Sequence, residues 1–523
     1  MISTKSLSNR RSRFKRPPSN KMPSDNSFKW DIDNCKDNRI IRDPQTFDLS
    51  FAPDKQLSII QRIEKNDHYE RDVVSVSGTI YFQRVSSDTP GPSAVVKIIV
   101  NDDAIDVAVE WDADKQALDI TVPRAIRWDE TGTRPCVNID VIVSVPEDGK
   151  LNKLKVGAVQ LNIMLLDNLS IDISDRALFE TVVGYIVAAA SGDASHDKAL
   201  FDTGAPDSFR LRSRYIQVET VSAMIEGSWP LYDYLSFQSI SGNIRVGIEP
   251  KEADKDEPKP AILSLQALSA HVDFHVPIHS AQKAFALSRA LPQTDMRAET
   301  VLPPRDYRLS IHTTSGHIKG SAAFSSICSV KTTSGNVAVD LLPALDSRLA
   351  EDGSKGVVLT TDSTSGTNDI AVLDPLWFDA AQRKYVDLPA LPPPPPPRPD
   401  NPPYVPINDD DPYKWLRRPK LPVNLSESGL ETVAARPWRN LNARHSTTSA
   451  NMRLHYPAVW EGAIRMTSVS GKLDAQGEGV KIIENGGHWG QRRLVAKKGE
   501  DGGGSIGVGS TSGNVAVLIG GDW

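Results

Sequence analysis

Residues 331–339, Lys-Thr-Thr-Ser-Gly-Asn-Val-Ala-Val, place a small polar pair, Ser334 and Gly335, directly before a short alternating apolar run. Alternation of apolar and polar residues is typical of a strand with one buried face, and small polar residues before it are typical of a turn. The same nine-residue frame recurs at 238–246, 312–320, 467–475 and 509–517. A turn and strand that recur along one chain predict a stacked repeat architecture.

The spacing of these copies indicates the size of one repeat. Aligned on Gly335, the copies fall at Gly184, Ala223, Gly242, Ala270, Gly316, Gly335, Gly366, Gly471 and Gly513. Successive positions differ by 39, 19, 28, 46, 19, 31, 105 and 42 residues. A unit of about 19 to 21 residues with insertions explains this series. We therefore expect an all-β fold, a parallel β-helix or β-solenoid of about nine or more irregular turns with a strand-rich N-terminal head.

The frame also predicts which side chains are buried. Val337 and Val339 should point into the shared interior, as should Ile244 and Val246 in another copy, because alternate residues of a strand lie on one face. Ala223 occupies the corner position that glycine holds elsewhere. A left-handed backbone would cost an alanine roughly 1 to 2 kcal/mol, so we expect the corner to require a small side chain rather than a positive φ.

Composition divides the chain into five segments. We expect a disordered basic tail at 1–45, a strand-rich head at 46–150, solenoid repeats at 151–374, a proline-rich insertion at 375–450, and final strands at 451–523 that stack on the same rod. In the head, alternating or β-type runs predict strands at 73–82, 94–100, 105–111, 117–122 and 137–145. We expect loops at 251–260 and 341–356.

The proline-rich insertion includes six consecutive prolines at 392–397, followed by Arg398. Such a run favours an extended polyproline II segment without internal hydrogen bonds. The run also fits the P-x-x-P-x-Arg pattern of peptides that dock in aromatic grooves. Two interpretations stay open, a stiff spacer and a docking peptide.

Charge and cysteine content exclude several classes of protein. A net charge of −6 over 523 residues predicts no general affinity for nucleic acid. Cys35, Cys136 and Cys328 are odd in number and widely spaced, which predicts neither a disulfide framework nor a thiolate metal site and favours a reducing compartment.

Targeting signals are weak in this sequence. The longest apolar run, 181–190, is shorter than the roughly 18 to 20 residues that span a bilayer, so we expect no transmembrane segment. No apolar run follows the basic cluster at 10–16, which is consistent with a plain tail, a mitochondrial transit peptide or a nuclear import signal. Without a visible signal peptide, a cytoplasmic location is the default expectation.

The phrase Thr-Ser-Gly-x-Val/Ile, as at 314–318, 333–337 and 511–515, resembles the adhesin-like β-strand-repeat domain family of unknown function, and in particular its fungal-type members. The resemblance covers roughly residues 150 to 520. It implies a right-handed parallel β-helix without established catalytic residues. It also implies a cell-surface location, reached in fungal relatives through a membrane span upstream that this sequence does not show.

Two groups of residues are candidates for chemistry. His271, Asp273 and His275, with His279 nearby, could share one face of a strand as zinc ligands, or could be a solvated polar face. Four aspartates near strand ends could hold the carboxylate pair of a glycoside hydrolase, or could be ordinary turn residues: Asp340, Asp362, Asp369 and Asp374. A solvated polar face and ordinary turn residues are the favoured interpretations, so we assign no catalytic, cofactor-binding or metal-binding residue.

We therefore expect an adhesin-like β-solenoid scaffold with a non-enzymatic binding or structural role, whose partner is a protein or a cell-wall carbohydrate. One alternative is a carbohydrate-active β-helix enzyme. Another is an intracellular interaction protein that uses the proline-rich segment. No cofactor is expected.

Overall fold

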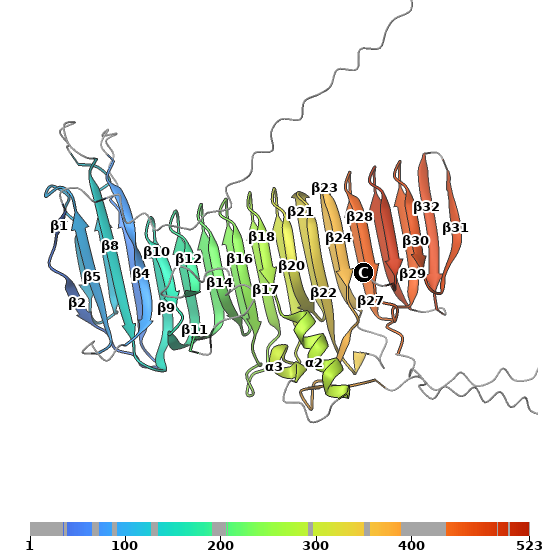
Figure 1. Cartoon of the computed structure of the whole chain (residues 1–523), viewed down its shortest axis with the longest axis horizontal. Helices are drawn as coiled ribbons and strands as arrows, with labels where there is room; N and C mark the ends of the chain where they lie inside the picture. The colour runs from blue at the N-terminus through green and yellow to red at the C-terminus, as the bar shows by residue number, and fades with distance from the viewer. Residues whose placement is uncertain are drawn as a thin grey trace, which may run out of the picture.

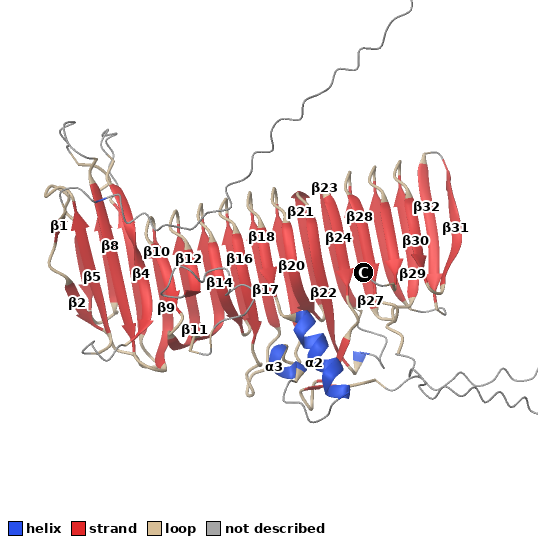
Figure 2. Ribbon diagram, in the orientation of Figure 1, coloured by secondary structure: helices blue, strands red, loops and turns tan. Residues whose placement is uncertain are grey.

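The chain folds into two large, mostly parallel β-sheets that face each other (Figures 1 and 2). The computed structural model describes residues 35, 39–64, 73–85, 91–126, 134–190, 206, 208–290, 297–349, 356–388, 436–488, 490–499 and 503–521. The basic cluster at 10–16 and the proline run at 392–398 lie outside these residues. The expected all-β fold is confirmed.

Among the described residues, one sheet has 18 strands and the other has 16, and we name them sheet A and sheet B. Sheet A contains β1 (Ile40–Ile41), β2 (Gln45–Asp48), β4 (Ser75–Arg84), β5 (Ser93–Val100), β8 (Cys136–Val145), β10 (Asn162–Leu166), β12 (Ile186–Ala190), β14 (Ile225–Leu231), β16 (Ile244–Pro250), β18 (Val272–His275), β20 (Ile318–Phe324), β22 (Val337–Asp346), β24 (Thr367–Val372), β25 (Leu376–Asp379), β26 (Lys384–Tyr385), β28 (Asn451–Tyr456), β30 (Leu473–Gly477) and β34 (Val515–Ile519). Sheet B contains β3 (Gln56–Ile63), β6 (Ala108–Asp112), β7 (Ala117–Val122), β9 (Gly149–Ala158), β11 (Ser170–Thr181), β13 (Arg210–Thr220), β15 (Tyr234–Ser239), β17 (Ala261–Ala267), β19 (Tyr307–Thr313), β21 (Ile327–Ser334), β23 (Val357–Ser365), β27 (Leu441–Thr447), β29 (Gly462–Ser468), β31 (Val480–His488), β32 (Gln491–Lys498) and β33 (Gly504–Ser510).

From β9 to β24 the chain crosses between the sheets at every strand. Odd-numbered strands lie in sheet B and even-numbered strands in sheet A, and each pairs in parallel with the next strand of its own sheet. For example, Val337 of β22 pairs with Ile318 of β20 on one side and Asn368 of β24 on the other. Equivalent residues of successive crossings therefore form straight rows, about 4.8 Å apart.

The core is the space between the sheets. Val337, Val339, Ile244 and Val246 are all buried there, as the alternation predicts. Aromatic side chains pack together in the core near β14, where the Trp229 ring lies 5.9 Å from Phe179 and 5.6 Å from Phe237 between centroids. Burying a large apolar side chain contributes about 1.5 to 3 kcal/mol, so this continuous interior stabilises the stack.

A hydroxyl closes the corner from sheet B to sheet A. The backbone N–H of Gly316 donates to Thr313 Oγ1 (3.1 Å), and that of Gly513 donates to Ser510 Oγ (2.9 Å). A Cβ built on Gly242 would lie 1.6 Å from the carbonyl oxygen of Ala223, the corner residue of the neighbouring crossing. Gly242 has no positive φ, so close backbone approach, rather than a left-handed conformation, is what requires a glycine there.

The residue after the corner forms a ladder of acceptors along the stack. The backbone N–H of His317 donates to His271 Nδ1 (3.2 Å), and that of Asn336 donates to His317 Nδ1 (2.9 Å). The backbone N–H of Thr367 then donates to Asn336 Oδ1 (2.9 Å). Each side chain thus satisfies a corner N–H of the next crossing, which would otherwise lack a strand partner.

Both ends of the stack place strands out of chain order. At the N-terminal end, β3 lies between β7 and β9, and β4 lies between β8 and β10. At the C-terminal end, β33 lies between β27 and β29, and β34 lies between β28 and β30. Antiparallel strands then extend the sheets: β5 and β6 pair with β8 and β7, and β32 pairs with β29. Strands β3 and β4 near the N-terminus, and β33 and β34 near the C-terminus, are therefore each paired with a strand on both sides.

Two sequence expectations are wrong. Cys35 and Cys136 form a disulfide, with 5.8 Å between their Cα atoms, and their separation of 101 residues hid the pairing. Residues 341–346 continue β22 and pair partly with β25, because their buried leucines fill the core, so the loop expected at 341–356 begins later. In addition to the strands, the 46-residue spacing between Ala270 and Gly316 contains two helices, α2 (Ile278–Ala290) and α3 (Ala298–Val301).

A candidate binding groove on sheet B

A groove of about 870 Å³ lies on the outer face of sheet B. Its lining residues come from β3, β9, β11, β13, β15, β17 and β19 and from the corners that follow these strands. Seven neighbouring strands span about 29 Å, at about 4.8 Å per step. The groove is therefore long and narrow, and it runs across the strands.

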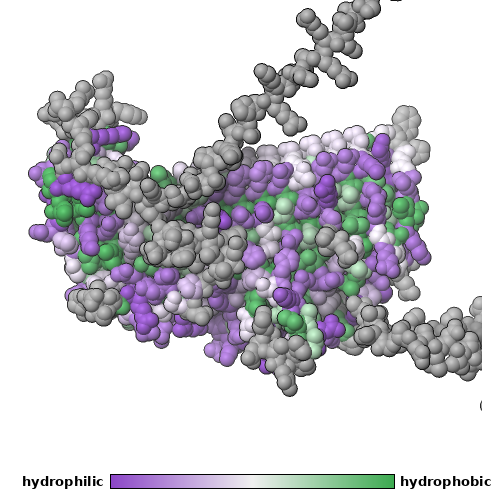
Figure 3. All heavy atoms as spheres, viewed as in Figure 1, coloured by the Kyte–Doolittle hydropathy of each residue, from purple (hydrophilic) through white to green (hydrophobic). Residues whose placement is uncertain are grey.

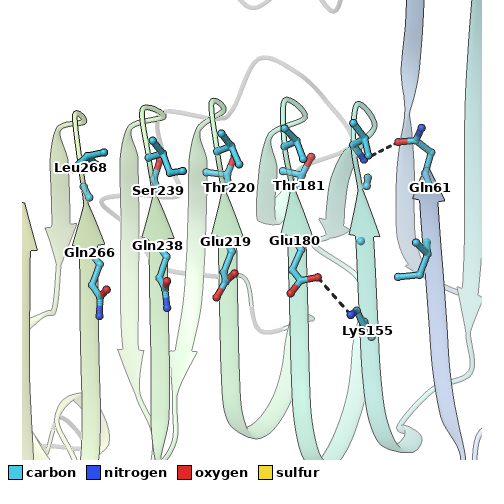
Figure 4. Close-up of a pocket in the computed structure, with 18 of the residues that line it drawn as sticks. Gln61, Lys155, Glu180, Thr181, Glu219, Thr220, Gln238, Ser239, Gln266 and Leu268 are labelled. Carbon is cyan, nitrogen blue, oxygen red and sulfur yellow. Dashed lines mark hydrogen bonds and ion pairs between the residues drawn. The ribbon is translucent and has the colours of Figure 1, made fainter. Parts of the chain in front are cut away.

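The floor of the groove is a row of polar side chains at one register position. Glu180, Glu219, Gln238, Gln266 and His312 pair in that order on successive strands. All five point away from the core and are half-buried or exposed. Figure 4 shows Glu180, Glu219, Gln238 and Gln266 side by side on their strands. Parallel in-register pairing therefore repeats a hydrogen-bonding group at each step.

Glutamates at one end of this row have polar partners. Lys155 Nζ lies 3.7 Å from Glu180 Oε2, and Gln217 Nε2 donates to Glu219 Oε1. The Lys155 and Glu180 side chains are 50% and 38% exposed, so solvent weakens their ion pair and leaves both groups accessible to a ligand.

The rim of the groove is apolar on the corner side. Val182, Ile240 and Leu268 are 38%, 49% and 50% exposed, and each begins the corner that follows its strand. At the β3 end, the buried Gln61 side chain joins β3 to the corner after β9: its Oε1 accepts from the backbone N–H groups of Val159 (2.8 Å) and Gln160 (3.0 Å) (Figure 4). The arrangement combines a polar floor with an apolar edge.

The structure separates the histidines and the aspartate that the sequence suggested as a metal site. His271 lies in the corner ladder, where its Nδ1 accepts from the His317 N–H and its ring stacks on that of His317 at 4.9 Å between centroids. Asp273 lies on the outer face of β18, and His275 Nδ1 lies 3.0 Å from Ser321 Oγ. Within the part of the chain that the structure describes, no three His, Cys, Asp or Glu side chains are grouped as metal ligands.

The four aspartates do not share one groove. Asp362 is in sheet B, where it accepts from Ser446 Oγ (2.6 Å) and lies 3.6 Å from Lys331 Nζ. Asp340 and Asp369 are in sheet A, 3.2 Å from His279 Nε2 and 3.6 Å from His455 Nε2. Asp374 follows β24, and burial raises the pKa of its carboxyl.

The outer face of sheet A carries a row of alternating charge. Glu226, Arg245, Asp273 and Lys319 pair in register on successive strands. Figure 3 shows this side of the molecule, where hydrophilic residues lie along most of its length. Opposite charges in direct cross-strand positions stabilise a sheet modestly and like charges destabilise it, so this row favours one strand register.

The repeat pattern in the sequence did not identify a buried histidine that contacts two hydroxyl groups inside the core. His445 is buried, with its Nδ1 2.6 Å from Thr361 Oγ1 and its Nε2 2.6 Å from the Tyr456 hydroxyl. Burial lowers the pKa of His445 to about 3, so the ring is neutral at neutral pH. The alternation of 441–447 places His445 on the inward face, which is the signal that could have identified it.

Comparison with known proteins gives little further guidance. No family model and no curated protein matches the chain. A crystal structure of a candidate cell adhesion protein from Clostridium sporogenes aligns with 91% of this chain and 99% of that chain, at 5% sequence identity and a TM-score of 0.14. A TM-score this low does not establish that the two proteins share a fold or a function. No helix among the described residues is long and apolar enough to cross a membrane.

Proposed function

We propose that the protein is an adhesin-like β-solenoid scaffold that binds an extended carbohydrate chain along the groove of sheet B. Strict alternation of the chain between two parallel sheets, with equivalent residues in rows, supports the solenoid. The observation that carries the binding function is the row from Glu180 to His312, which crosses five successive strands on an exposed face. A linear polymer that lies along such a row can form a hydrogen bond with the side chain on each strand.

The chemistry of the groove favours carbohydrate among linear polymers. Amide and carboxylate side chains such as Gln238 and Glu219 accept and donate the hydrogen bonds that sugar hydroxyls offer. The apolar rim at Ile240 and Leu268 suits the C–H faces of sugar rings. None of the groove residues is Phe, Tyr or Trp, so the stacking platform that single-stranded nucleic acids use is lacking among them.

A pull-down with insoluble β-glucan and chitin, followed by calorimetry with soluble oligosaccharides of the polymer that binds, tests this function. A Gln238→Ala/Gln266→Ala variant removes two hydrogen-bonding groups, each worth about 0.5 to 1.5 kcal/mol, so affinity should fall about tenfold or more. The matched control is Gln476→Ala, an exposed residue of β30 in sheet A. Equal affinity of the double variant and the control would exclude the groove as the binding site.

A carbohydrate-active enzyme is the second candidate, and one observation favours it. Glu180 and Glu219 are direct neighbours in the groove, on parallel strands about 4.8 Å apart. Retaining glycosidases use two carboxyl groups separated by about 5 to 5.5 Å. Release of reducing ends from the bound polysaccharide, abolished by Glu180→Gln or Glu219→Gln, would support an enzyme; binding without release supports the scaffold.

A further inference from the structure

A second cavity, of about 400 Å³, lies on the outer face of sheet B near its C-terminal end. Its floor is β33, and its sides are β27 and β29, which pair with β33 on either side. Gly507 pairs with Arg444 on one side and with Arg465 on the other. The two arginines therefore flank a glycine on strands about 9 to 10 Å apart. We name this cavity the arginine trough.

The trough is deep because two outward positions of β33 have no side chain. Arg444 and Arg465 flank Gly507. Gly509 pairs with Ser446 and Thr467, so two hydroxyl groups flank Gly509. A Cβ at Gly509 would meet nothing within 4 Å, and one at Gly507 would meet only the Ala443 carbonyl oxygen, at 3.9 Å. By contrast, a Cβ at Gly504 would lie 2.6 Å from the Leu441 carbonyl oxygen.

Packing therefore requires glycine at Gly504, whereas neither packing nor backbone conformation requires it at Gly507 or Gly509. Neither of the latter two has a positive φ. Glycine in a strand interior weakens the strand and is found where a ligand or another backbone approaches closely. Both glycines lie under open space between polar walls, so the approaching group must come from outside the fold.

The two guanidinium groups lack partners of their own. Among the described residues, neither Arg444 nor Arg465 has an ion pair or a side-chain hydrogen bond, and both are exposed. Asp362, an acid on the same sheet, already accepts from Ser446 and pairs with Lys331. On sheet A, by contrast, charged residues alternate in sign along the row. Two arginines that lie on the same outer face, on either side of one strand and without a paired acid among the described residues, favour an anion between them.

We propose that the arginine trough binds a carboxylate-bearing sugar of an acidic polysaccharide. The planar carboxylate lies between Arg444 and Arg465, which can each donate two parallel hydrogen bonds to it. The sugar ring lies over Gly507 and Gly509, and the hydroxyls of Ser446 and Thr467 flank its own hydroxyl groups. The inference does not depend on the function of the groove, because the trough uses other strands of sheet B.

The walls favour a sugar acid over other anionic polymers. The trough residues include no aromatic side chain besides the imidazole of His445, which is buried in the core, so bases of a nucleic acid have no ring to stack on. An acidic peptide would use the same arginines but has no need for the flat glycine floor or the flanking hydroxyls. The glycines and hydroxyls together are what select a polyhydroxylated ring.

Calorimetry or biolayer interferometry of the full chain with three probes tests the proposal: polygalacturonate, poly-L-glutamate and dextran. Polygalacturonate should bind, and the binding should weaken as salt is raised, because exposed charges are screened. Dextran and poly-L-glutamate should bind at least about tenfold more weakly, since each lacks one of the two features. Equal binding of poly-L-glutamate would overturn the choice of a sugar ligand, and absence of polygalacturonate binding would overturn the site.

Two variants connect the binding to the trough. Arg444→Gln/Arg465→Gln should weaken polygalacturonate binding about 100-fold, whereas Arg245→Gln/Arg453→Gln, which removes two charges from sheet A, should leave it unchanged. Gly509→Thr should fold normally, because its Cβ meets nothing, and should still lose binding at least about tenfold by filling the floor. Unchanged binding in either trough variant, with normal hydrogen-exchange protection of β33, would refute the proposal.

Discussion

The buried imidazole of His445 makes the stability of the C-terminal crossings depend on pH. Its pKa is about 3 in the folded chain and 6.5 in an unperturbed side chain, because burial disfavours the charged ring. Above about pH 6.5 the ring is neutral in both states and the folded state keeps its full stability. Below that pH the unfolded chain takes up a proton that the folded chain does not, so stability falls progressively toward about pH 3.

The size of this loss follows from the pKa difference. Each pH unit between the two pKa values costs about 1.4 kcal/mol, so lowering the pH from 6.5 to 4.5 should remove roughly 2 to 3 kcal/mol of stability. His445→Gln keeps groups that hydrogen-bond Thr361 and Tyr456 but does not titrate. The stability of wild type relative to this variant should therefore decline with that slope, while other titrating groups cancel in the difference.

Hydrogen exchange measured by mass spectrometry is the suitable assay, because long stacks of strands do not unfold in a single two-state step. Peptides that contain β27 and β28 should lose protection in wild type relative to His445→Gln as the pH falls. Peptides that contain β14 and β16, far from His445, provide the internal control. Parallel pH profiles of the two proteins at β27 would refute the assignment of a neutral buried ring.

Three further predictions concern the stack itself. Val337→Asp buries an unpaired charge and should locally unfold β20 to β24 at a cost above about 3 kcal/mol, whereas Asn336→Asp keeps an acceptor for the Thr367 N–H and should be nearly silent; equal melting shifts would contradict this difference. Gly242→Ala places a Cβ 1.6 Å from the Ala223 carbonyl oxygen and should cost several kcal/mol by urea unfolding, whereas Ala223→Gly should cost about 1 kcal/mol or less; the reverse order would show that corner size is not limiting. Deleting residues 503–521 removes β33 and β34 from between two earlier crossings, so hydrogen exchange should rise in β27 to β30 and stay low from β9 to β22; protection of β29 without β33 would count against the observed strand order.

Much of the local structure follows from sequence pattern. The alternation at 337–339 and 244–246 identified side chains that are buried in the core. The corner frame predicted a demand for small residues, and the stack explains it: Ala223, Ala270 and Ala450 each lie next to glycine corners, so no two methyl groups meet. The predicted series of corners does not include Ala450, which falls in the segment 375–450 expected as a proline-rich insertion, although Thr447 Oγ1 accepts from its N–H (2.9 Å) as at other corners.

Sites were less predictable because they depend on residues from different strands. Glu180 and His312 lie on one groove floor although 132 positions separate their numbers, since three further strands pair between theirs. Likewise, Gly507 separates Arg444 from Arg465 only because β33 pairs between β27 and β29. The sequence pattern of β33 contains the glycines but not the identity of their neighbours.

The sequence by itself determined the strand period, the inward face and the small corner, because each depends on residues a few positions apart, where backbone sterics and alternation act directly. Only the tertiary structure decided the order of the end crossings, the Cys35–Cys136 disulfide and the surfaces built from rows of side chains. These features depend on which strands pair, and that choice is made by burial and hydrogen bonding summed over the whole stack. A local motif repeated at each corner specifies stacking, and the outward residues between corners remain available for binding.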